Sequence, residues 1–467
     1  MKTMYFWDTA ECTLTGNVAV ELCHPQMKEK LYTFDAPWEG NCVGYFNIVK
    51  WQDTYYLYYG ANSYPPYQCE HSMHPIAFCL LESADGIHFW PPKLPGCDFY
   101  GNRNNNIVWI GTPTTDNFTV MVDENPDCLP EERFKAVSGG TAKNENGRSY
   151  GVLDLYVSAD GHSFTFSRRL PVTGNFDSQN TLIYDKKRRT YILYSRKMSG
   201  SPDNPVWGGI RTVRVCYSDD LTTFSEPELI TYSDGHDFEM YTNGIRPYGD
   251  IFIGTPTRYL DRADEAEEIK NLPDRENRQY MIDRWGRMGT ALTDSLFMFS
   301  RDGEHFTRFP EAFLTPGPEA ARNWYYGDCY LSHGHTVTRS AFEGAPDEIS
   351  MFLSRNYRSD KACEMWRCTV RRDGFACIRA GYDGGTVLTQ RVMTDGDLNV
   401  NFATSAVGHI TIAILLDGCR IYTTRRLFGD SVSREVKLPD DIKTKIGNKY
   451  VQIAFTMCDA SLYSITI

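Results

Sequence analysis

The segment SADGIHF at residues 83–89 returns along the chain, and this repeat decides the fold. The other copies are SADGHSF (158–164), SDDLTTF (218–224) and SRDGEHF (300–306), with a degraded copy, RRDGF, at 371–375. In this pattern the Ser and Asp side chains can bond nearby backbone amides in a tight turn, and Gly supplies the positive φ that the turn needs. The final Phe can then fold back between strands. The chain is therefore predicted to repeat one small sheet.

Each copy of this turn follows a run of β-branched and aromatic residues, such as AFCLLE, VLDLYV, VRVCY and LFMF. Two further runs of this kind precede it; in the first unit they are VGYFNIVKW and YYLYYGA. Such residues are typical of β-strands. Five four-stranded units predict an all-β fold, a five-bladed β-propeller over residues 31–380, which is a closed ring with protected edges. Residues 1–30 are expected to pack on its core, and only residues 262–271, RADEAEEIKN, look helical.

The repeat ends near residue 380, where the sequence character changes. Six short alternating stretches follow, which are LNVNFAT, HITIAILL, CRIYTT, REVKL, KYVQIAFTM and LYSITI. They predict a separate β-sandwich over residues 384–467, with the junction at YDGG, residues 382–385. This part carries no cluster of titratable residues, so we expect it to serve packing rather than chemistry.

Composition limits the class of protein. The 467 residues carry a net charge of −12, which argues against binding to nucleic acid or to an anionic membrane. No run approaches the roughly 18 apolar residues that a membrane span needs, and the N-terminus does not resemble a signal peptide. The 14 cysteines contain no CxxC pair, so they are expected to be reduced thiols of a cytoplasmic protein. We expect no cofactor and no metal, and the oligomeric state stays open.

Three carboxylates stand just ahead of the first strand of a predicted unit: Glu39 in DAPWEGN, Asp177 in GNFDSQN and Glu239 in HDFEMYTN. The first strands of all blades surround the propeller axis, so side chains at their ends converge. Each carboxylate has an aromatic neighbour, and partial desolvation favours the protonated form that a general acid needs. The alternative is that these residues only order turns.

Several strings, PWEG, NNNIV, RFKA, SADGIHF, FDSQN, YTNGIRPY and SRDGEHF, resemble those of a bacterial group of invertase-like glycosidases. More broadly, residues 30–467 resemble the five-bladed propeller glycoside hydrolases, which include the invertase and fructan-hydrolase family, the arabinanases and the β-xylosidases. The resemblance implies Glu39 as nucleophile or base, Asp177 as the residue that orients the sugar and tunes the acid, and Glu239 as general acid. The invertase string Asn-Asp-Pro-Asn is absent, and a Glu stands where an Asp is expected, so Asp35 is a rival to Glu39.

Other residues near the expected mouth of the propeller are candidates for substrate binding. They are Asn105, Asn106, Tyr241, Arg246, Arg322, Trp324 and Asp328. Each also has a structural alternative as a turn or core residue. Asp123 is an alternative carboxylate of the second unit. His333 and His335 share a strand face and either contact a metal or water, or are satisfied core histidines.

The favoured function is a glycoside hydrolase that acts on a small oligosaccharide, with a fructofuranoside or arabinofuranoside preferred. Carboxyl groups of Glu39 and Glu239 about 5–5.5 Å apart would make it retaining, and about 6.5–9.5 Å inverting. Because Glu reaches further than Asp, retention is slightly favoured. The alternatives are a sugar phosphorylase or transglycosylase, with Arg246, Arg258 and Arg322 as phosphate ligands, and a carbohydrate-binding propeller without catalysis.

Overall fold

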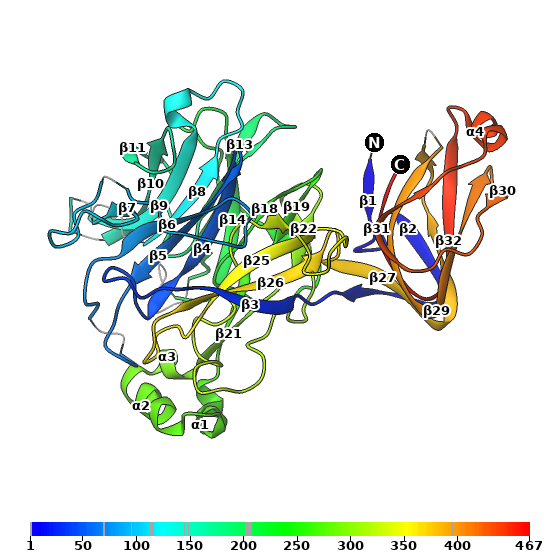
Figure 1. The fold of residues 1–467 in the computed structure, drawn as a ribbon. Helices are drawn as coiled ribbons and strands as arrows, with labels where there is room; N and C mark the ends of the chain where they lie inside the picture. The colour runs from blue at the N-terminus through cyan, green and yellow to red at the C-terminus, as the bar shows by residue number, and fades with distance from the viewer. Residues whose placement is uncertain are drawn as a thin grey trace. The chain divides into compact units, whose positions relative to one another are not determined.

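The computed structural model describes residues 2–68, 71–94, 96–111, 116–143, 145–147, 149–200, 208–394 and 396–467. They divide into two compact units. The larger unit comprises residues 26–338 and 350–369, and the smaller one comprises residues 1–25, 339–349 and 370–467. Most regular structure in both units is β-strand (Figure 1). No helix among the described residues is long and apolar enough to cross a membrane.

Within the described residues, five sheets of the larger unit follow the five predicted repeats in chain order. Sheet 1 contains β4 (Cys42–Trp51), β5 (Thr54–Asn62), β6 (Ala77–Ser83) and β7 (Ile107–Ile110). Sheet 2 contains β8 (Asp116–Val122), β9 (Phe134–Lys143), β10 (Ser149–Ser158) and β11 (Thr165–Arg169), with the 3-10 helix η1 (Pro130–Glu132) before β9. Sheet 3 contains β12 (Thr181–Asp185), β13 (Thr190–Met198), β14 (Arg211–Ser218) and β15 (Glu228–Leu229).

Sheet 4 contains β18 (Arg246–Tyr248), β19 (Ile251–Gly254), β22 (Met298–Ser300), β23 (His305–Arg308) and β16 (Thr231–Tyr232). Sheet 5 contains β24 (Thr336–Thr338), β25 (Glu348–Arg355), β26 (Glu364–Arg371) and β3 (Gln26–Thr33). The prediction of an all-β fold built from many small sheets is confirmed.

The first strands of neighbouring sheets are cross-linked by buried polar side chains. Asn47 on β4 accepts a hydrogen bond from the backbone N–H of Val120 on β8 at 2.6 Å, and β8 lies against β12. Thr181 on β12 donates to the Asn243 side chain, which precedes β18, at 3.0 Å. His333, which precedes β24, bonds both to Asn47 at 3.1 Å and to the Ile245 carbonyl at 2.9 Å. The five sheets therefore follow one another in a closed order.

The repeated turn forms as its sequence predicts. In the first copy the Ser83 hydroxyl accepts the N–H of Gly86 at 2.8 Å, and Asp85 accepts the N–H groups of Ile87 and His88. Gly86 has a φ of 74°, in the left-handed region that favours glycine. The copies at 158–164, 218–224 and 300–306 repeat these hydrogen bonds. The turn is thus set by local sequence alone.

The N-terminal residues have a different place from the expected one. Residues 1–30 were expected to pack on the propeller core. In the structure, β3 is the outer strand of sheet 5 and pairs antiparallel with β26, with Thr33 opposite Glu364. Residues 1–25 belong to the smaller unit instead. The physical reason is pairing: an N-terminal strand satisfies the free edge that the last repeat would otherwise expose.

A helical insertion lies between strands β19 and β22 of sheet 4 in the sequence. A small sheet of β17 (Glu239–Met240), β20 (Thr257–Asp261) and β21 (Ala291–Ser295) carries it. The insertion contains η2 (Ala263–Glu265), α1 (Ala266–Asn271), α2 (Arg275–Trp285) and α3 (Arg287–Thr290). The expected helix at 262–271 is confirmed, whereas α2 was missed, because its polar sequence RENRQYMIDRW has no clear apolar stripe.

The smaller unit is one bent sheet around its own core. Its elements are β1 (Thr3–Tyr5), β2 (Cys12–Leu22), β27 (Ala376–Thr389), β28 (Val392–Met393), β29 (Leu398–Leu416), β30 (Cys419–Thr423), β31 (Asp430–Val436), α4 (Asp440–Ile446) and β32 (Tyr450–Thr466). The stretches LNVNFAT and HITIAILL, expected to be separate strands, are two halves of β29. The stretches KYVQIAFTM and LYSITI are likewise halves of β32.

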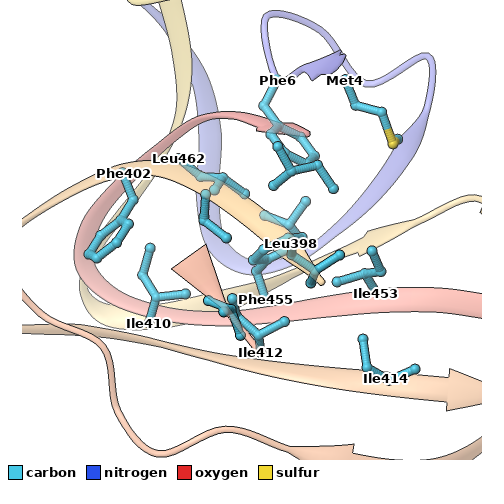
Figure 2. Packing of buried hydrophobic residues seen from close by; sticks show 14 of the residues in the cluster. Met4, Phe6, Leu398, Phe402, Ile410, Ile412, Ile414, Ile453, Phe455 and Leu462 are labelled. Atoms are coloured by element: carbon cyan, nitrogen blue, oxygen red, sulfur yellow. The ribbon is translucent and has the colours of Figure 1, made fainter. Parts of the chain in front are cut away.

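These long strands bend where their pairing register breaks. The breaks lie between Ala380 and Gly385 and between Thr404 and His409, and Asp459 takes a φ of 43° between the halves of β32. Both halves turn their buried residues to one cluster (Figure 2), so the sheet folds over a single core. The boundary also differs from the expected 384–467, because β27 starts at Ala376 and residues 1–25 join this unit.

Candidate functional site

Glu39 lies in a tight turn that precedes β4, the first strand of sheet 1. Its side chain is only 2% exposed. Tyr59 donates to Glu39 Oε1 at 2.5 Å, and the Ala36 backbone N–H donates to Oε2 at 3.1 Å. Burial raises the pKa of the carboxyl to about 7. The hydrogen bonds from Tyr59 and Ala36 lower this pKa, and the charge of Asp35 raises it. Glu39 is therefore a buried acid whose two oxygens both have protein partners.

The surroundings of Glu39 are closed by a polar network. Asn106 donates to the Tyr59 hydroxyl at 2.9 Å and accepts from the Trp38 indole N–H at 2.7 Å. This network lies within one sheet. No contact of Glu39 with Asp177 or Glu239 is present among the described residues, and its proposed role as nucleophile or base stays a prediction. The rival Asp35 is exposed at the turn.

Sheet 3 presents two arginines to the region ahead of β18. Arg196 on β13 pairs with Val213, and Arg211 on β14 is two residues from that position, so both lie on one face of the sheet. Both guanidinium groups stand over the ring of Tyr241, with centroid distances of 5.7 and 5.5 Å. The arginine charges and a hydrogen bond with Tyr326 lower the pKa of Tyr241 despite its burial. Tyr241 thus contacts two cationic groups.

Each arginine also holds one predicted catalytic carboxylate. Arg196 forms an ion pair with Asp177, and Arg211 forms one with Glu239 Oε2, which also accepts the Arg211 backbone N–H at 3.3 Å. Asp177 and Glu239 are therefore each paired with an arginine that lies over the Tyr241 ring. A guanidinium partner is typical of an ionised carboxylate. Apolar surroundings were expected for Glu239, but its carboxyl group contacts the Arg211 guanidinium.

Glu239 also lines an open groove of about 560 Å³ above the sheet that carries the insertion. The groove contains three aromatic side chains and three carboxylates. Its lining residues are Ile210, Asp237, Phe238, Glu239, Arg258, Tyr259, Leu260, Arg262, Leu292, Thr293, Asp294, Thr315, Pro316 and Trp324. We call it the Glu239 groove. Aromatic walls with a few convergent polar groups are the usual lining of ligand sites.

The carboxylates of the groove differ in their hydrogen-bond partners. Asp294 is bound by Arg258, with Nε at 3.0 Å from Oδ1. Among the described residues, neither Glu239 Oε1 nor the exposed carboxyl of Asp237 has a hydrogen-bond partner. Two carboxylate groups in the groove can therefore receive a ligand without breaking a bond within the protein.

Of the remaining predicted binding residues, Trp324 lines the groove and Tyr241 lies behind Glu239. Asn105 and Asn106 lie elsewhere, with amide groups already bonded to the Cys97 carbonyl and to the Leu80 carbonyl. The amide groups of both asparagines thus have protein partners, and their expected role in substrate binding stays a prediction.

Three charged residues of the predicted set are likewise committed to protein partners. Arg322 forms a bidentate pair with Asp360, at 2.6 and 3.2 Å. Asp328 is buried, which raises its carboxyl pKa to about 6, and it accepts the Tyr325 N–H at 3.2 Å. Arg246 is buried among the first strands. The three arginines of the alternative phosphate site have different partners: Arg246 donates to His335, Arg258 to Asp294 and Arg322 to Asp360.

The histidines of the fifth unit act as cross-links. Arg246 donates to His335 Nδ1 at 3.1 Å, and His333 bonds to Asn47 and to Ile245. Burial lowers the pKa of His333 to about 4 and that of His335 to about 3, so both are neutral at pH 7. These bonds and the burial fit the interpretation of both residues as hydrogen-bonded core histidines. Among the described residues, no group of three His, Cys, Asp or Glu side chains is placed to hold a metal.

Asp123, the alternative carboxylate of the second unit, is fully buried. It pairs with Lys135 at 2.9 Å and accepts from Tyr191 at 2.7 Å. It joins sheet 2 to sheet 3 and does not line the groove.

Sequence reasoning missed Arg196, Arg211, Tyr259 and Asp294. A signal for the arginines was present: Arg196 stands near the end of the strand TYILYSRKM, and Arg211 begins the strand RTVRVCYS, both next to runs of buried residues. A charged residue at such a position is rarely buried unless it is paired. Their carboxylate partners, however, lie in other segments of the chain.

Comparison with known proteins gives structural likenesses only. No protein-family model and no curated protein matches the sequence. An N-acetylgalactosamine deacetylase from F. plautii matches with a TM-score of 0.44 and 13% identity, over 76% of this chain and 96% of that one. A β-fructofuranosidase from Bombyx mori matches with a TM-score of 0.41 and 10% identity, over 93% of each chain. An α-L-arabinofuranosidase from Fusarium graminearum matches with a TM-score of 0.40 and 11% identity, over 75% of this chain and 98% of that one.

Proposed function

We propose that the protein is a glycoside hydrolase whose reaction takes place in the Glu239 groove. The observation that carries the proposal is the carboxylate of Glu239: Arg211 fixes one oxygen, and the other opens into a groove walled by Phe238, Tyr259 and Trp324. Aromatic faces suit the apolar face of a sugar ring, and free carboxylate oxygens suit its hydroxyl groups and reacting carbon.

Hydrolysis of a glycosidic bond needs two carboxyl groups, one that protonates the leaving oxygen and one that attacks or activates water. Glu239, held by a cation, is the better candidate for the attacking or basic group. Asp237 is the other free carboxyl of the groove and is the candidate acid. This assignment differs from the sequence prediction of Glu239 as acid, and it leaves Glu39 outside the reaction.

The substrate class in this proposal is a small oligosaccharide, with a furanoside kept as the first choice from the sequence resemblance. A cytoplasmic place of action is also kept, and cell fractionation tests it. The paired states of Arg246, Arg258 and Arg322 give no separate support to a phosphorylase.

The test is a screen of aryl furanosides and pyranosides with the wild type, Glu239→Gln and Asp237→Asn. We expect Glu239→Gln to lose about 10²–10⁴-fold in rate and to be rescued by azide, which replaces a lost nucleophile or base. Asp237→Asn should lose activity mainly on substrates with poor leaving groups. Glu228→Gln, an exposed change away from the groove, is the control. Wild-type rates in both groove variants would refute the proposal.

A further inference from the structure

The helical insertion contains a buried arginine that is bonded to backbone alone. Arg278 on α2 is 1% exposed. Its Nε donates to the Pro273 carbonyl at 2.7 Å, Nη1 to the Trp324 carbonyl at 2.9 Å, and Nη2 to the Asn323 carbonyl at 2.8 Å. Its guanidinium also stands 4.1 Å from the centroid of the Tyr325 ring. A buried charge is tolerated only with such complete partners.

The segment that Arg278 grips forms one wall of the Glu239 groove. Trp324 takes a φ of 59°, a left-handed conformation that is a strained position for a bulky residue. Its indole N–H donates to the Gly317 carbonyl at 2.9 Å. The Asn323 side chain closes the same loop through the Pro316 carbonyl at 2.9 Å and the Ala320 N–H at 2.7 Å. The backbone around Trp324 is therefore held from both sides.

Strain of this kind persists only where the surroundings fix it. The loop's own hydrogen bonds close the indole side, and Arg278 supplies the fixed points on the carbonyl side. The planar fork of an arginine can hold two carbonyls at set angles, whereas a lysine offers one point charge. The insertion thus supplies, through Arg278, hydrogen bonds that hold the backbone at Asn323 and Trp324.

We propose that Arg278 is a positioning residue, which fixes Trp324 as the aromatic wall against which a sugar ring of the substrate packs. The inference rests on the proposed function for the identity of the ligand, but the link between Arg278 and Trp324 does not. An interaction that a substrate makes equally in the ground state and in the transition state contributes to KM and not to kcat. The packing of a sugar ring on an aromatic wall is such an interaction, so loss of the fork should weaken substrate binding more than it slows bond cleavage.

The experiment uses the full chain with 5-fluorotryptophan and compares Arg278→Lys with Arg275→Lys. Arg275 begins the same helix and is exposed, so its replacement is the matched control. The ¹⁹F resonance of Trp324 is assigned by its loss in Trp324→Phe. We expect Arg278→Lys alone to shift or broaden that resonance and to raise the KM for an oligosaccharide at least about tenfold, with kcat changed less than threefold.

Each other outcome has a separate meaning. An unchanged Trp324 resonance in folded Arg278→Lys overturns the inference whatever the activity. A changed resonance with wild-type KM overturns the role of Trp324 as a substrate wall. If the wild type cleaves no glycoside, the proposed function fails, and titration of the Trp324 resonance with oligosaccharides then decides: no shift with any of them overturns the inference too.

Discussion

Replacement of Glu39 by Gln separates a buried structural acid from a catalytic one. The pKa of Glu39 rises from an ordinary 4.5 to about 7 because the group is buried. Folding therefore favours the protonated form. The stability that this form provides is fully present below about pH 4.5 and is lost as the pH rises through about 7.

The size of the effect follows from linkage. One pKa unit corresponds to about 1.4 kcal/mol, so between pH 5 and pH 8 Glu39 should lower the unfolding free energy of the wild type by roughly 2.5 kcal/mol. A Gln does not titrate, so Glu39→Gln should lack this loss. It should carry a constant penalty of about 1–2 kcal/mol instead, because Gln has one acceptor oxygen where Glu39 has two, so either Tyr59 or the Ala36 N–H then faces an NH2 group.

The assay is urea unfolding followed by tryptophan fluorescence at several pH values between 5 and 8. Glu228→Gln, at an exposed position, controls for the loss of a charge. We also expect Glu39→Gln to keep kcat/KM within about threefold of the wild type, since general acid–base groups contribute about 10²-fold or more. Parallel stability curves for the wild type and Glu39→Gln, or a loss of activity above 10²-fold, would refute this reasoning.

Three further outcomes are expected. His333 has a pKa lowered to about 4 by burial, so this residue alone should lower the stability by roughly 2.5 kcal/mol as the pH drops from about 6.5 to 4, and His333→Gln should remove that share of the slope in urea unfolding. Tyr58→Phe removes a 2.9 Å hydrogen bond to the Gly161 carbonyl and should lower the unfolding free energy by about 1 kcal/mol. Arg211→Met frees Glu239 and should reduce kcat/KM at least about 10²-fold, measured with the best aryl glycoside from the screen.

The parts of the fold that local sequence decides could be predicted. The repeated turn depends on Ser83, Asp85 and Gly86, which lie within four positions of one another, so its hydrogen bonds are visible in the sequence pattern. Helix α2 could not be predicted in this way. Its buried contact is Arg278, whose carbonyl partners at Asn323 and Trp324 lie more than forty residues away.

Closure at the N-terminus was beyond local reasoning for a similar cause. The strand QMKEKLYT of β3 has no turn signal and few buried residues, so nothing in it names sheet 5 as its partner. The free edge of β26 supplies the reason for the pairing, and that edge exists only once the rest of the ring has formed.

The same argument explains why the Arg211 partner of Glu239 was not predicted. Its sequence neighbours Phe238 and Met240 suggested an apolar setting. Phe238 does line the groove beside Glu239, but Met240 is the next residue of the same strand, and adjacent residues of a strand point to opposite faces. Met240 accordingly turns into the core, whereas Glu239 meets Arg211, a residue of the preceding sheet. The partner of a carboxylate at a strand end can therefore come from the sheet beside it. In this chain the informative residues were Arg196 and Arg211 on the strands of the third repeat, in addition to the aromatic residues next to the acid.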